Sequence, residues 1–267
     1  MKQLNLKEIH ATLLGILTDV DAFCREHDLR YSLAYGTLLG AVRHEGFIPW
    51  DDDIDIMMPR ADFERFVQLY RDRGPFQCLY NTDSPEARFI TCYAKVMDSR
   101  TVSIEKKRKN IYRFGLNLDI FPVDAAPADP AVQEEFAKTV SRLRRRIYLS
   151  QRPFFPFTFH DPLIPKIQAH RHPVSWWMER CITYLTRFNG TGSPYAGPVS
   201  GGGGTIEIYD RQLFEDYIDI AFEGHFFRAV ADYDTFLRQQ FGNYMQLPPE
   251  SERKTHGLTA YRKEKGD

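Results

Sequence analysis

Four aspartates fall within five positions of one short segment, a spacing that points to metal chemistry. In YGTLLGAVRHEGFIPWDDDIDIMMPR, residues 35–60, they are Asp51, Asp52, Asp53 and Asp55, directly before a run of Ile and Met. Crowded carboxylates repel one another and resist burial, so a cluster beside an apolar segment needs a cation. The spacing therefore predicts a bound metal ion.

The alternation around Asp53 and Asp55 indicates how two of these carboxylates are presented. On a strand over residues 53–58, alternate side chains face opposite ways, so the two aspartates share one face. Ile54 and Ile56 then anchor the other face in the core. Two carboxylates on one rigid element suit Mg²⁺ or Mn²⁺, which accept carboxylates, water and substrate phosphate as ligands.

Asp119, in the segment GLNLDIFPVD, is the candidate for a third carboxylate. On a strand over residues 116–121 it faces away from Leu118 and Ile120, which are typical core residues. Three carboxylates on two strands would suit phosphoryl or nucleotidyl transfer, in which metal ions hold the attacking and leaving oxygens.

Gly36 and Thr37 are candidate phosphate-binding residues. They stand where a predicted strand over 30–35 changes to a predicted helix over 37–44. A helix N-terminus offers free N–H groups and the positive end of the helix dipole to an anion. The missing side chain of Gly36 would allow the ligand to approach closely.

Other interpretations of the carboxylates stay open. A calcium loop could start at Asp51, but Ile56 and Asp62 stand where that loop needs Gly and Glu. The cluster could instead be a solvated acidic turn. Asp119 could be a strand-edge carboxylate paired with an arginine.

The composition is that of a globular protein without a strong field of either sign. Of the 267 residues 43% are hydrophobic and 14% aromatic, enough for a large core. Lys plus Arg number 35 against 36 for Asp plus Glu, so the net charge of −1 argues against a nucleic-acid-binding protein. The N-terminal stretch is broken by charges and fits neither a signal peptide nor a membrane span.

The four cysteines are scattered and sit among apolar neighbours, which is typical of a reduced, cytoplasmic protein. Only Cys24 and His27 have a spacing that a zinc site could use, and plain helix neighbours are the favoured interpretation of that pair. No pattern in the sequence indicates an oligomeric state.

The elements that must position these residues include both helices and strands. Apolar residues at helical spacing over residues 6–24, with a capping box from Asn5 and Glu8, predict an amphipathic first helix. Another helix is predicted over 62–71. Strand-like runs complete a mixed sheet and cover residues 76–80, 89–97, 101–104 and 116–121.

The second half of the chain has a different character. AAPADP after Asp124 marks a boundary, residues 131–188 are expected to be mainly helical, and residues 193–204 to form a loop. The run Gly201–Gly204 lacks the Lys-Ser/Thr of a phosphate loop, which favours a flexible connector. The tail adds a helix that stops at Gly242.

Three segments together resemble the LicD family, which includes the fukutin-related LicD-like domains. They are YSLAYGTLLGAVRHEGFIPWDDDIDIMMPR, LDIFPVD and FEGHFFRAVADYDTFLRQQFGNYMQLPP. The resemblance spans residues 5–257 and is weakest over residues 130–200. It implies an α+β fold: a nucleotidyltransferase-like mixed sheet flanked by helices, with a mainly helical C-terminal half.

The resemblance also implies one catalytic domain over residues 1–267. Within it we expect a nucleotidyltransferase-like core over 1–125 and a helical insertion with a loop over 126–204 on the acceptor side. A helical C-terminal part over 205–267 would complete the site.

The resemblance assigns roles to the candidate residues by position. The metal-binding and catalytic carboxylates would be Asp53, Asp55 and Asp119. Residues on the substrate side would be Gly36, Thr37, Arg43, Asp51, Lys95, Arg253 and His256. For Arg43, Lys95 and His256, an ordinary surface or ion-pair role is the alternative.

The implied activity is metal-dependent transfer of an alcohol phosphate, typically phosphocholine from CDP-choline, to a sugar hydroxyl of a cell-surface glycan. The acceptor would be a glycan or lipid-linked saccharide, such as lipopolysaccharide or teichoic acid. One carboxylate, with Asp119 as the first choice, would take the hydroxyl proton, and CMP would leave in line. A nucleotidyltransferase that moves NMP and a non-catalytic metal- or nucleotide-binding module are the alternatives.

Three further features have no settled role. Choline would need aromatic ring faces, for which Trp50, Tyr93, Tyr112, Phe114 and Phe121 are candidates. The basic run SRLRRRIYLSQRP is expected to be a solvated helix face, with contact to the inner face of a membrane as the alternative. The run EKKRKN, residues 105–110, is expected at a hairpin tip beside the site.

Overall fold

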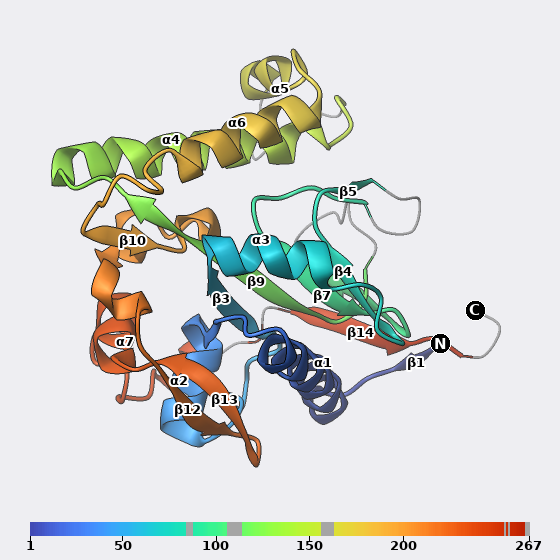
Figure 1. Ribbon diagram of the computed structural model, residues 1–267. Coiled ribbons are helices and arrows are strands. Elements are labelled where there is room, and N and C mark those ends of the chain that lie inside the picture. Colours follow the sequence, from blue (N-terminus) through green and yellow to red (C-terminus); the bar gives the residue numbers. More distant parts are fainter. Residues whose placement is uncertain (84–87, 106–113, 156–162, 254, 256, 265–267) are drawn as a thin grey trace.

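A computed structural model describes residues 1–83, 88–105, 114–155, 163–253, 255 and 257–264. The α+β prediction is confirmed: strands form a mixed sheet and helices surround it (Figure 1). The helices near the sheet are α1 (Leu6–Glu26), α2 (Tyr35–His44), α3 (Arg60–Leu69) and α7 (Tyr233–Phe241). A separate layer contains α4 (Pro130–Ser150), α5 (Leu163–Ala169) and α6 (Val174–Thr186).

The strand β9 (Asn117–Ala126) is the centre of the main sheet. One edge of β9 pairs in parallel with β3 (Asp55–Pro59), and β3 pairs antiparallel with β2 (Ser32–Leu33). The other edge of β9 is shared by two antiparallel strands, β7 (Ala94–Asp98) along its first part and β10 (Tyr195–Gly197) along its last residues. The sheet is extended by β4 (Phe76–Leu79) beside β7 and β11 (Tyr209–Asp210) beside β10.

Smaller strand groups complete the structure. A three-stranded sheet joins the two ends of the chain and contains β1 (Lys2–Gln3), β14 (Leu258–Arg262) and β8 (Thr101–Glu105). Two-stranded pairs are formed by β5 (Thr82–Asp83) with β6 (Arg88–Phe89), and by β12 (Tyr217–Phe222) with β13 (His225–Val230).

The predicted amphipathic helix and its capping box are confirmed in α1. The backbone N–H of Glu8 donates to Asn5 Oδ1 at 3.0 Å, and the N–H of Asn5 donates to Glu8 Oε2 at 2.9 Å. Two of the first-turn N–H groups therefore find partners locally. Cys24 is fully buried in this helix and the ring of His27 packs on Phe23, so the pair are helix neighbours.

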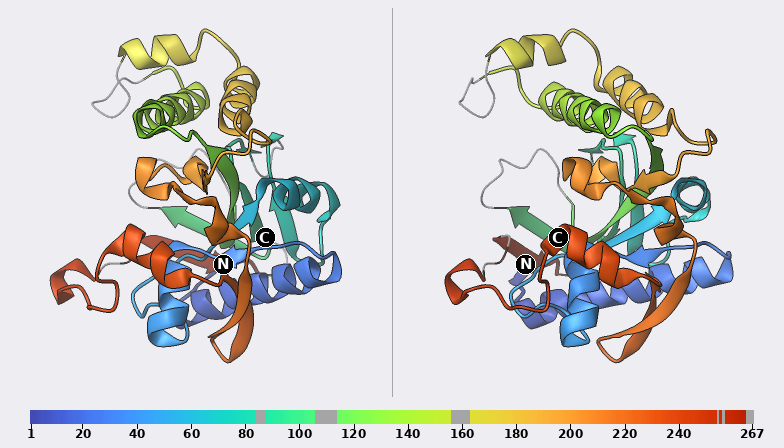
Figure 2. Two further views of the ribbon diagram at one scale, coloured as in Figure 1. Left: turned by 60° about the vertical axis from the view of Figure 1, so that its left-hand side comes forward. Right: turned by 90° about the vertical axis from the view of Figure 1, so that its left-hand side faces the viewer.

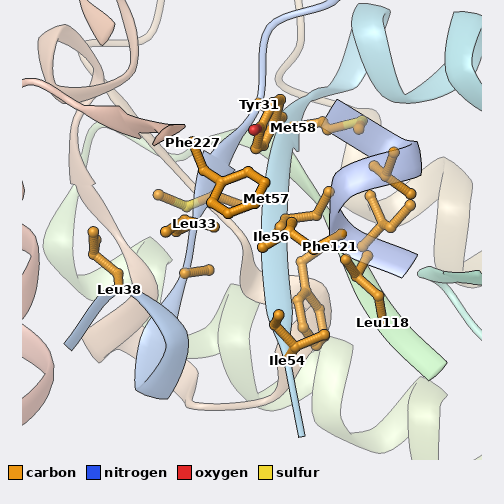
Figure 3. Close-up of a cluster of buried hydrophobic side chains, with 14 of the residues drawn as sticks. Tyr31, Leu33, Leu38, Ile54, Ile56, Met57, Met58, Leu118, Phe121 and Phe227 are labelled. Atoms are coloured by element: carbon orange, nitrogen blue, oxygen red, sulfur yellow. The ribbon is translucent and has the colours of Figure 1, made fainter. Parts of the chain in front are cut away.

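The apolar face behind the aspartates forms the main core, as the alternation predicts. Ile54, Ile56 and Leu118 are each at most 1% exposed and lie together in Figure 3. The helices α1 and α3 lie side by side against the sheet, since Phe23 and Phe66 pack edge to face at 5.6 Å between ring centres. Burial of this face fixes the strands that carry the acidic residues.

A buried ion pair stands where β9 leaves the sheet toward the helical layer. Arg60 donates two hydrogen bonds to Asp124, at 2.8 and 2.5 Å. Asn189 donates to the same carboxylate at 2.8 Å and accepts from the N–H of Ala125 at 2.7 Å. Figure 2 shows the helical layer lying beyond this end of the sheet.

Several predicted boundaries differ from the structure. The strand expected over 30–35 is β2 over Ser32–Leu33, and the helix expected over 37–44 already begins at Tyr35. The strand expected over residues 53–58 begins only at Asp55, because β2 ends at Leu33 and the chain turns into α2 at Tyr35. Residues before Asp55 therefore have no strand partner on that side. The loop expected over 193–204 contains β10 and a turn of 3-10 helix over Val199–Gly201.

The part over 205–267, expected to be helical, contains the helix α7, which ends at Gly242 as predicted, but also strands. Between β12 and β13 lies a two-residue loop, Glu223 and Gly224, with φ of 50° and 75°. Positive φ at both positions is the geometry of a tight hairpin turn, so the chain reverses there. Short 3-10 turns cover Gly204–Glu207, Arg211–Phe214 and Glu250–Glu252.

Candidate active site

The sheet register brings two predicted carboxylates together. Asp55, the first residue of β3, is directly opposite Asp119 of β9, and Asp119 is directly opposite Lys95 of β7. Residues opposite each other on neighbouring strands project to the same face. Three charged side chains from three adjacent strands therefore meet on the face away from Ile54 and Ile56.

Asp119 is held in place by two donors. Lys95 Nζ and Asn117 Nδ2 both donate to its Oδ1, the latter at 2.7 Å. Lys95 is nearly buried, and although burial opposes its charge, Asp119 and other nearby groups raise its pKa overall. Lys95 is therefore a fixed positive charge beside the carboxylates.

Asp55 is surrounded by other carboxylates. Burial raises the pKa of this carboxyl well above its usual range, and the charges of Asp53 and Asp119 add to the rise. Lys95 opposes the rise without cancelling it. The strand register brings Asp55 and Asp119 together, and Asp53, which precedes the strand, acts on Asp55 through its charge.

The predicted phosphate-binding residues lie against the same acidic segment. The N–H of Asp55 donates to Thr37 Oγ1 at 2.8 Å, so Thr37 fixes the start of β3. A Cβ added to Gly36 would come 2.7 Å from Asp51 Oδ2. A side chain at Gly36 would therefore displace the Asp51 carboxylate from the N-terminal turn of α2.

Arg43 and Arg253 come together at the other end of α2. Arg43 donates to the carbonyl of Tyr244 at 2.8 Å, and burial with the charge of Arg253 lowers its pKa. The guanidinium of Arg253 lies 5.2 Å from the ring centre of Trp50, which directly precedes Asp51. His256, the remaining predicted residue of this group, lies outside the described residues.

Aromatic rings surround the Lys95 and Asp119 pair. The ring of Phe121 packs on those of Tyr93 at 4.8 Å and Tyr35 at 5.5 Å between centres. Lys95 Nζ lies 5.5 Å from the ring centre of Tyr93 and 5.3 Å from that of Phe114. The candidate rings for choline that lie in the described part of the chain are Trp50, Tyr93, Phe114 and Phe121. Tyr112 lies outside it.

Sequence reasoning missed a buried carboxylate next to this site. Glu207 is 3% exposed, and Tyr35 donates to its Oε1 at 2.8 Å. The N–H of Gly202 donates to Oε2 at 3.1 Å, and burial raises the pKa of the carboxyl. Gly201 and Gly203 of the glycine run pack against Glu207, because a Cβ on either would crowd this side chain, whereas a Cβ on Gly204 would meet open space.

The donor chemistry of the site fits a hard divalent cation. Several carboxylates crowd around Asp55 against the single ammonium of Lys95, and oxygen donors are what Mg²⁺ and Mn²⁺ prefer. In the described part of the chain, no three His, Cys, Asp or Glu side chains are already grouped as a metal site. A cation here would share its ligands between carboxylates and a bound phosphate, as is usual for Mg²⁺.

Opposed carboxylates on the central strands of a mixed sheet, beside a Gly-Thr helix start, define a protein of the nucleotidyltransferase type. The family model described as LicD/FKTN/FKRP, nucleotidyltransferase domain, matches residues 28–161. The chain belongs to this family. The match covers the acidic segment, Lys95 and Asp119.

Similar proteins extend the match to almost the whole chain. A lipopolysaccharide cholinephosphotransferase LicD of Haemophilus influenzae is 31% identical over 266 residues, which are 97% of this chain and 98% of that protein. An uncharacterised protein of Rickettsia prowazekii is 33% identical over 42% of this chain and 40% of its own length. One of Rickettsia typhi is 40% identical over 22% of this chain and 19% of its own length.

Proposed function

We propose that the chain transfers phosphocholine from CDP-choline to a sugar hydroxyl of a lipopolysaccharide-type glycan, with Mg²⁺ or Mn²⁺ as cofactor. The observation that carries the proposal is the opposition of Asp55 and Asp119 beside Lys95, all within the residues that the family model matches. The whole-length similarity to a lipopolysaccharide cholinephosphotransferase supports the choice of alcohol and acceptor.

In the reaction, the acceptor oxygen forms a bond to the choline-bearing phosphorus of the donor. The bond from that phosphorus to the oxygen bridging the two phosphates breaks, and CMP leaves with the bond electrons. The hydroxyl proton passes to a carboxylate. Asp119 is the candidate acceptor, because Lys95 and Asn117 fix its Oδ1, and its Oδ2 has no hydrogen bond within the described residues.

The other residues bind and orient the donor. Asp53, Asp55 and Asp119 would hold the divalent cation, which when bound neutralises charge on the diphosphate. Lys95 stays protonated and stabilises negative charge that moves onto the leaving phosphate. Gly36 and Thr37 place the N-terminal turn of α2 at the same segment, where its N–H groups favour phosphate.

The acceptor is proposed to approach from the side of the helical layer. A groove of about 560 Å³ lies between α4 and the glycine turns, lined in part by Ala137, Ser141 and Gly203. Within the described ranges, none of the helices has the length and apolar character needed to cross a bilayer. Cytoplasmic location and peripheral contact with a membrane remain part of the proposal.

The test is a transfer assay with CDP-choline labelled in the choline, lipopolysaccharide lacking phosphocholine, and Mg²⁺ or Mn²⁺. The proposal expects labelled glycan and one CMP per transfer, with neither formed when EDTA is present. CDP-ribitol and CDP-glycerol serve as competing donors. Label from CTP in the product would identify an NMP transferase instead, and binding of nucleotide without any transfer would favour a non-catalytic module.

A further inference from the structure

The short helix α5 has an inverted distribution of polar and apolar side chains. Leu163, Ile164 and Ile167 recur at helical spacing and share one side of the helix. They are 46%, 67% and 40% exposed, whereas Lys166 is 1% exposed. A helix that packs on a protein core normally buries its apolar side chains and exposes its lysine. The apolar side of α5 therefore faces outward.

The buried Lys166 fastens the preceding segment to α5. Its Nζ donates to the carbonyl of Pro153 at 3.0 Å and to that of Phe154 at 3.4 Å. The ring of Phe154 also packs on that of His170, which follows α5, at 5.3 Å between centres. Phe155, the next residue along the chain, is 67% exposed and adds a fourth apolar side chain. The α5 patch consists of Phe155, Leu163, Ile164 and Ile167.

The α5 patch belongs to the outer side of the helical layer. In Figures 1 and 2, α4 and α6 lie between α5 and the sheet. Arg146 of α4 donates to the carbonyl of Pro165 at 2.9 Å, and Trp177 Nε1 of α6 donates to the carbonyl of Ala169 at 2.7 Å. Both longer helices therefore hold α5 in place.

Basic side chains accompany the patch. Residues 141–188 contain nine Lys or Arg and two Asp or Glu, in a chain whose net charge is −1. Arg145, Arg171 and Arg180 are exposed. Trp176 stacks on His172 at 3.8 Å between ring centres, and the guanidinium of Arg180 lies 4.2 Å from the centre of the Trp176 ring. Trp and basic residues beside exposed apolar side chains are typical of surfaces that meet a membrane interface.

The size and charge of this surface favour a lipid over a protein partner. A stable protein interface takes about 20–30 residues from each partner, whereas the α5 patch has four large apolar side chains. A positively charged segment with outward apolar residues matches an anionic bilayer. The headgroups attract Lys and Arg, and the apolar side chains enter the boundary between headgroups and acyl chains.

We propose that the α5 patch docks the protein on an anionic phospholipid surface, with the exposed arginines of the helical layer on the headgroups. This is a second binding surface, separate from the carboxylates, and it needs neither nucleotide nor metal. It rests on the proposed function only for its purpose, which is to bring the enzyme to an acceptor glycan that is carried on a lipid.

The first test measures sedimentation of the full chain with vesicles. The vesicles are phosphatidylcholine alone and an equal mixture of phosphatidylcholine and phosphatidylglycerol, each at low and at high NaCl. Ile164→Gln/Ile167→Gln is compared with a matched control on the hairpin of β12 and β13, Ile218→Gln/Phe226→Gln, whose side chains are 39% and 66% exposed. We expect wild type to prefer the anionic vesicles and to bind less as salt rises. The α5 variant should bind about tenfold more weakly or less, and the hairpin control should bind like wild type.

A second variant tests the charge and keeps the apolar residues. Arg171→Gln/Arg180→Gln should bind anionic vesicles about tenfold or more weakly, because each basic residue near the surface adds attraction. Its binding to phosphatidylcholine alone should be unchanged. The control is Arg65→Gln/Arg71→Gln, which alters two exposed arginines in and just after α3. All these variants should keep the Tm of wild type, since the replaced side chains are exposed.

Three results would overturn the proposal. They are wild type that binds neither kind of vesicle, an α5 variant that binds like wild type, and a hairpin control that loses as much binding as the α5 variant. Sedimentation velocity without lipid tests a second copy of the chain as the occupant. A dimer that is lost in the α5 variant, with vesicle binding unchanged, would make the α5 patch a protein interface instead.

The two proposals can fail separately. Transfer to a lipid-free glycan should be unchanged in the α5 variant, whereas transfer to the same glycan on vesicles should fall together with vesicle binding. If wild type binds vesicles through the α5 patch but transfers no phosphocholine, the proposed function fails and the docking surface stands. If wild type transfers phosphocholine and the α5 variant uses both forms of the glycan equally well, only the docking surface fails.

Discussion

Two carboxylates on β9, Asp119 and Asp124, occupy opposite electrostatic situations. Asp124 is 2% exposed and fully matched by the two hydrogen bonds of Arg60 and the amide of Asn189. Asp119 faces another carboxylate, Asp55, across the strand pair and has one ammonium, Lys95, for both. In the first arrangement the carboxylate is matched by its neighbours, although Arg60 Nη1 has no hydrogen-bond partner among the described residues, and in the second negative charge is in excess.

The difference indicates a structural role for one carboxylate and a functional role for the other on the same strand. A buried pair whose opposite charges are matched has little charge to offer a ligand, and breaking it leaves an uncompensated charge. Carboxylates placed opposite one another cost stability, and such strain is typical of functional sites. Asp124 should therefore control folding, and Asp119 should control catalysis.

The largest expected effect is on the rate of transfer. Asp119→Asn should lower kcat/KM for CDP-choline by about a thousandfold or more, because it removes a metal-binding charge and the candidate proton acceptor. Its free energy of unfolding should stay near that of wild type. The labelled-choline assay and urea unfolding measure the two quantities on the same preparation. A kcat/KM within about tenfold of wild type would remove Asp119 from the catalytic group.

The opposite result is expected for Asp124→Asn. Loss of this charge leaves the buried guanidinium of Arg60 uncompensated and should lower the free energy of unfolding by about 3–5 kcal/mol. Urea unfolding measures the change, and Asp72→Asn is the control because that carboxylate is exposed. Transfer per folded molecule should be close to wild type. A variant as stable as wild type would show that the ion pair does not anchor the end of β9.

A smaller effect of opposite sign is expected for Asp55→Asn. Because the folded state raises the pKa of Asp55 above its unfolded value, it favours the protonated form. In metal-free protein the contribution of Asp55 to stability should therefore fall as pH rises from the unfolded pKa through the raised folded pKa. At neutral pH, Asp55→Asn should have a higher Tm than wild type by a few degrees, while losing transfer.

Tm measured against pH in EDTA, for wild type and Asp55→Asn, checks this sign. The gap between the two proteins should be small at acid pH, widen toward neutral pH, and close when Mg²⁺ and nucleotide stabilise only the wild type. A gap that shrinks as pH rises would contradict the assignment of Asp55 to crowded surroundings.

The smallest expected effect is that of Tyr35→Phe. The change removes one hydrogen bond to Glu207, whose carboxylate keeps the N–H donors of Gly202 and Gly203. The free energy of unfolding should fall by about 1 kcal/mol, as measured by urea unfolding. A loss as large as that of Asp124→Asn would mean that Glu207 depends on Tyr35 alone.

Local patterns predicted much of the fold and the carboxylate group. Alternation around Asp55 and Asp119 predicted two strands with an apolar face turned to the core, and the burial of Ile54 and Leu118 confirms that face. The capping box at Asn5 and the glycine stop at Gly242 are likewise local signals.

Contacts between distant segments could not be predicted in the same way. The pairing of Lys95 with Asp119 depends on β7 lying beside β9, and the Arg60 to Asp124 pair joins residues 64 positions apart. Glu207 follows a glycine run. The close packing of Gly201 and Gly203 against Glu207 is visible only in the three-dimensional structure. In the basic run of α4, Arg144 is half-buried and Arg145 is exposed, and a run of equal charges carries no signal that separates the two.

The most direct test compares thermal stabilisation by CDP-choline, with and without Mg²⁺, in wild type, Asp119→Asn and Asp124→Asn. The account predicts that ligand and metal together raise the Tm of wild type beyond CMP with metal. Asp119→Asn should lose that rise, and Asp124→Asn should keep it from a lower starting Tm. Retention of the full rise in Asp119→Asn, or its loss only in Asp124→Asn, would contradict the assignment of the crowded carboxylates as the metal and donor site.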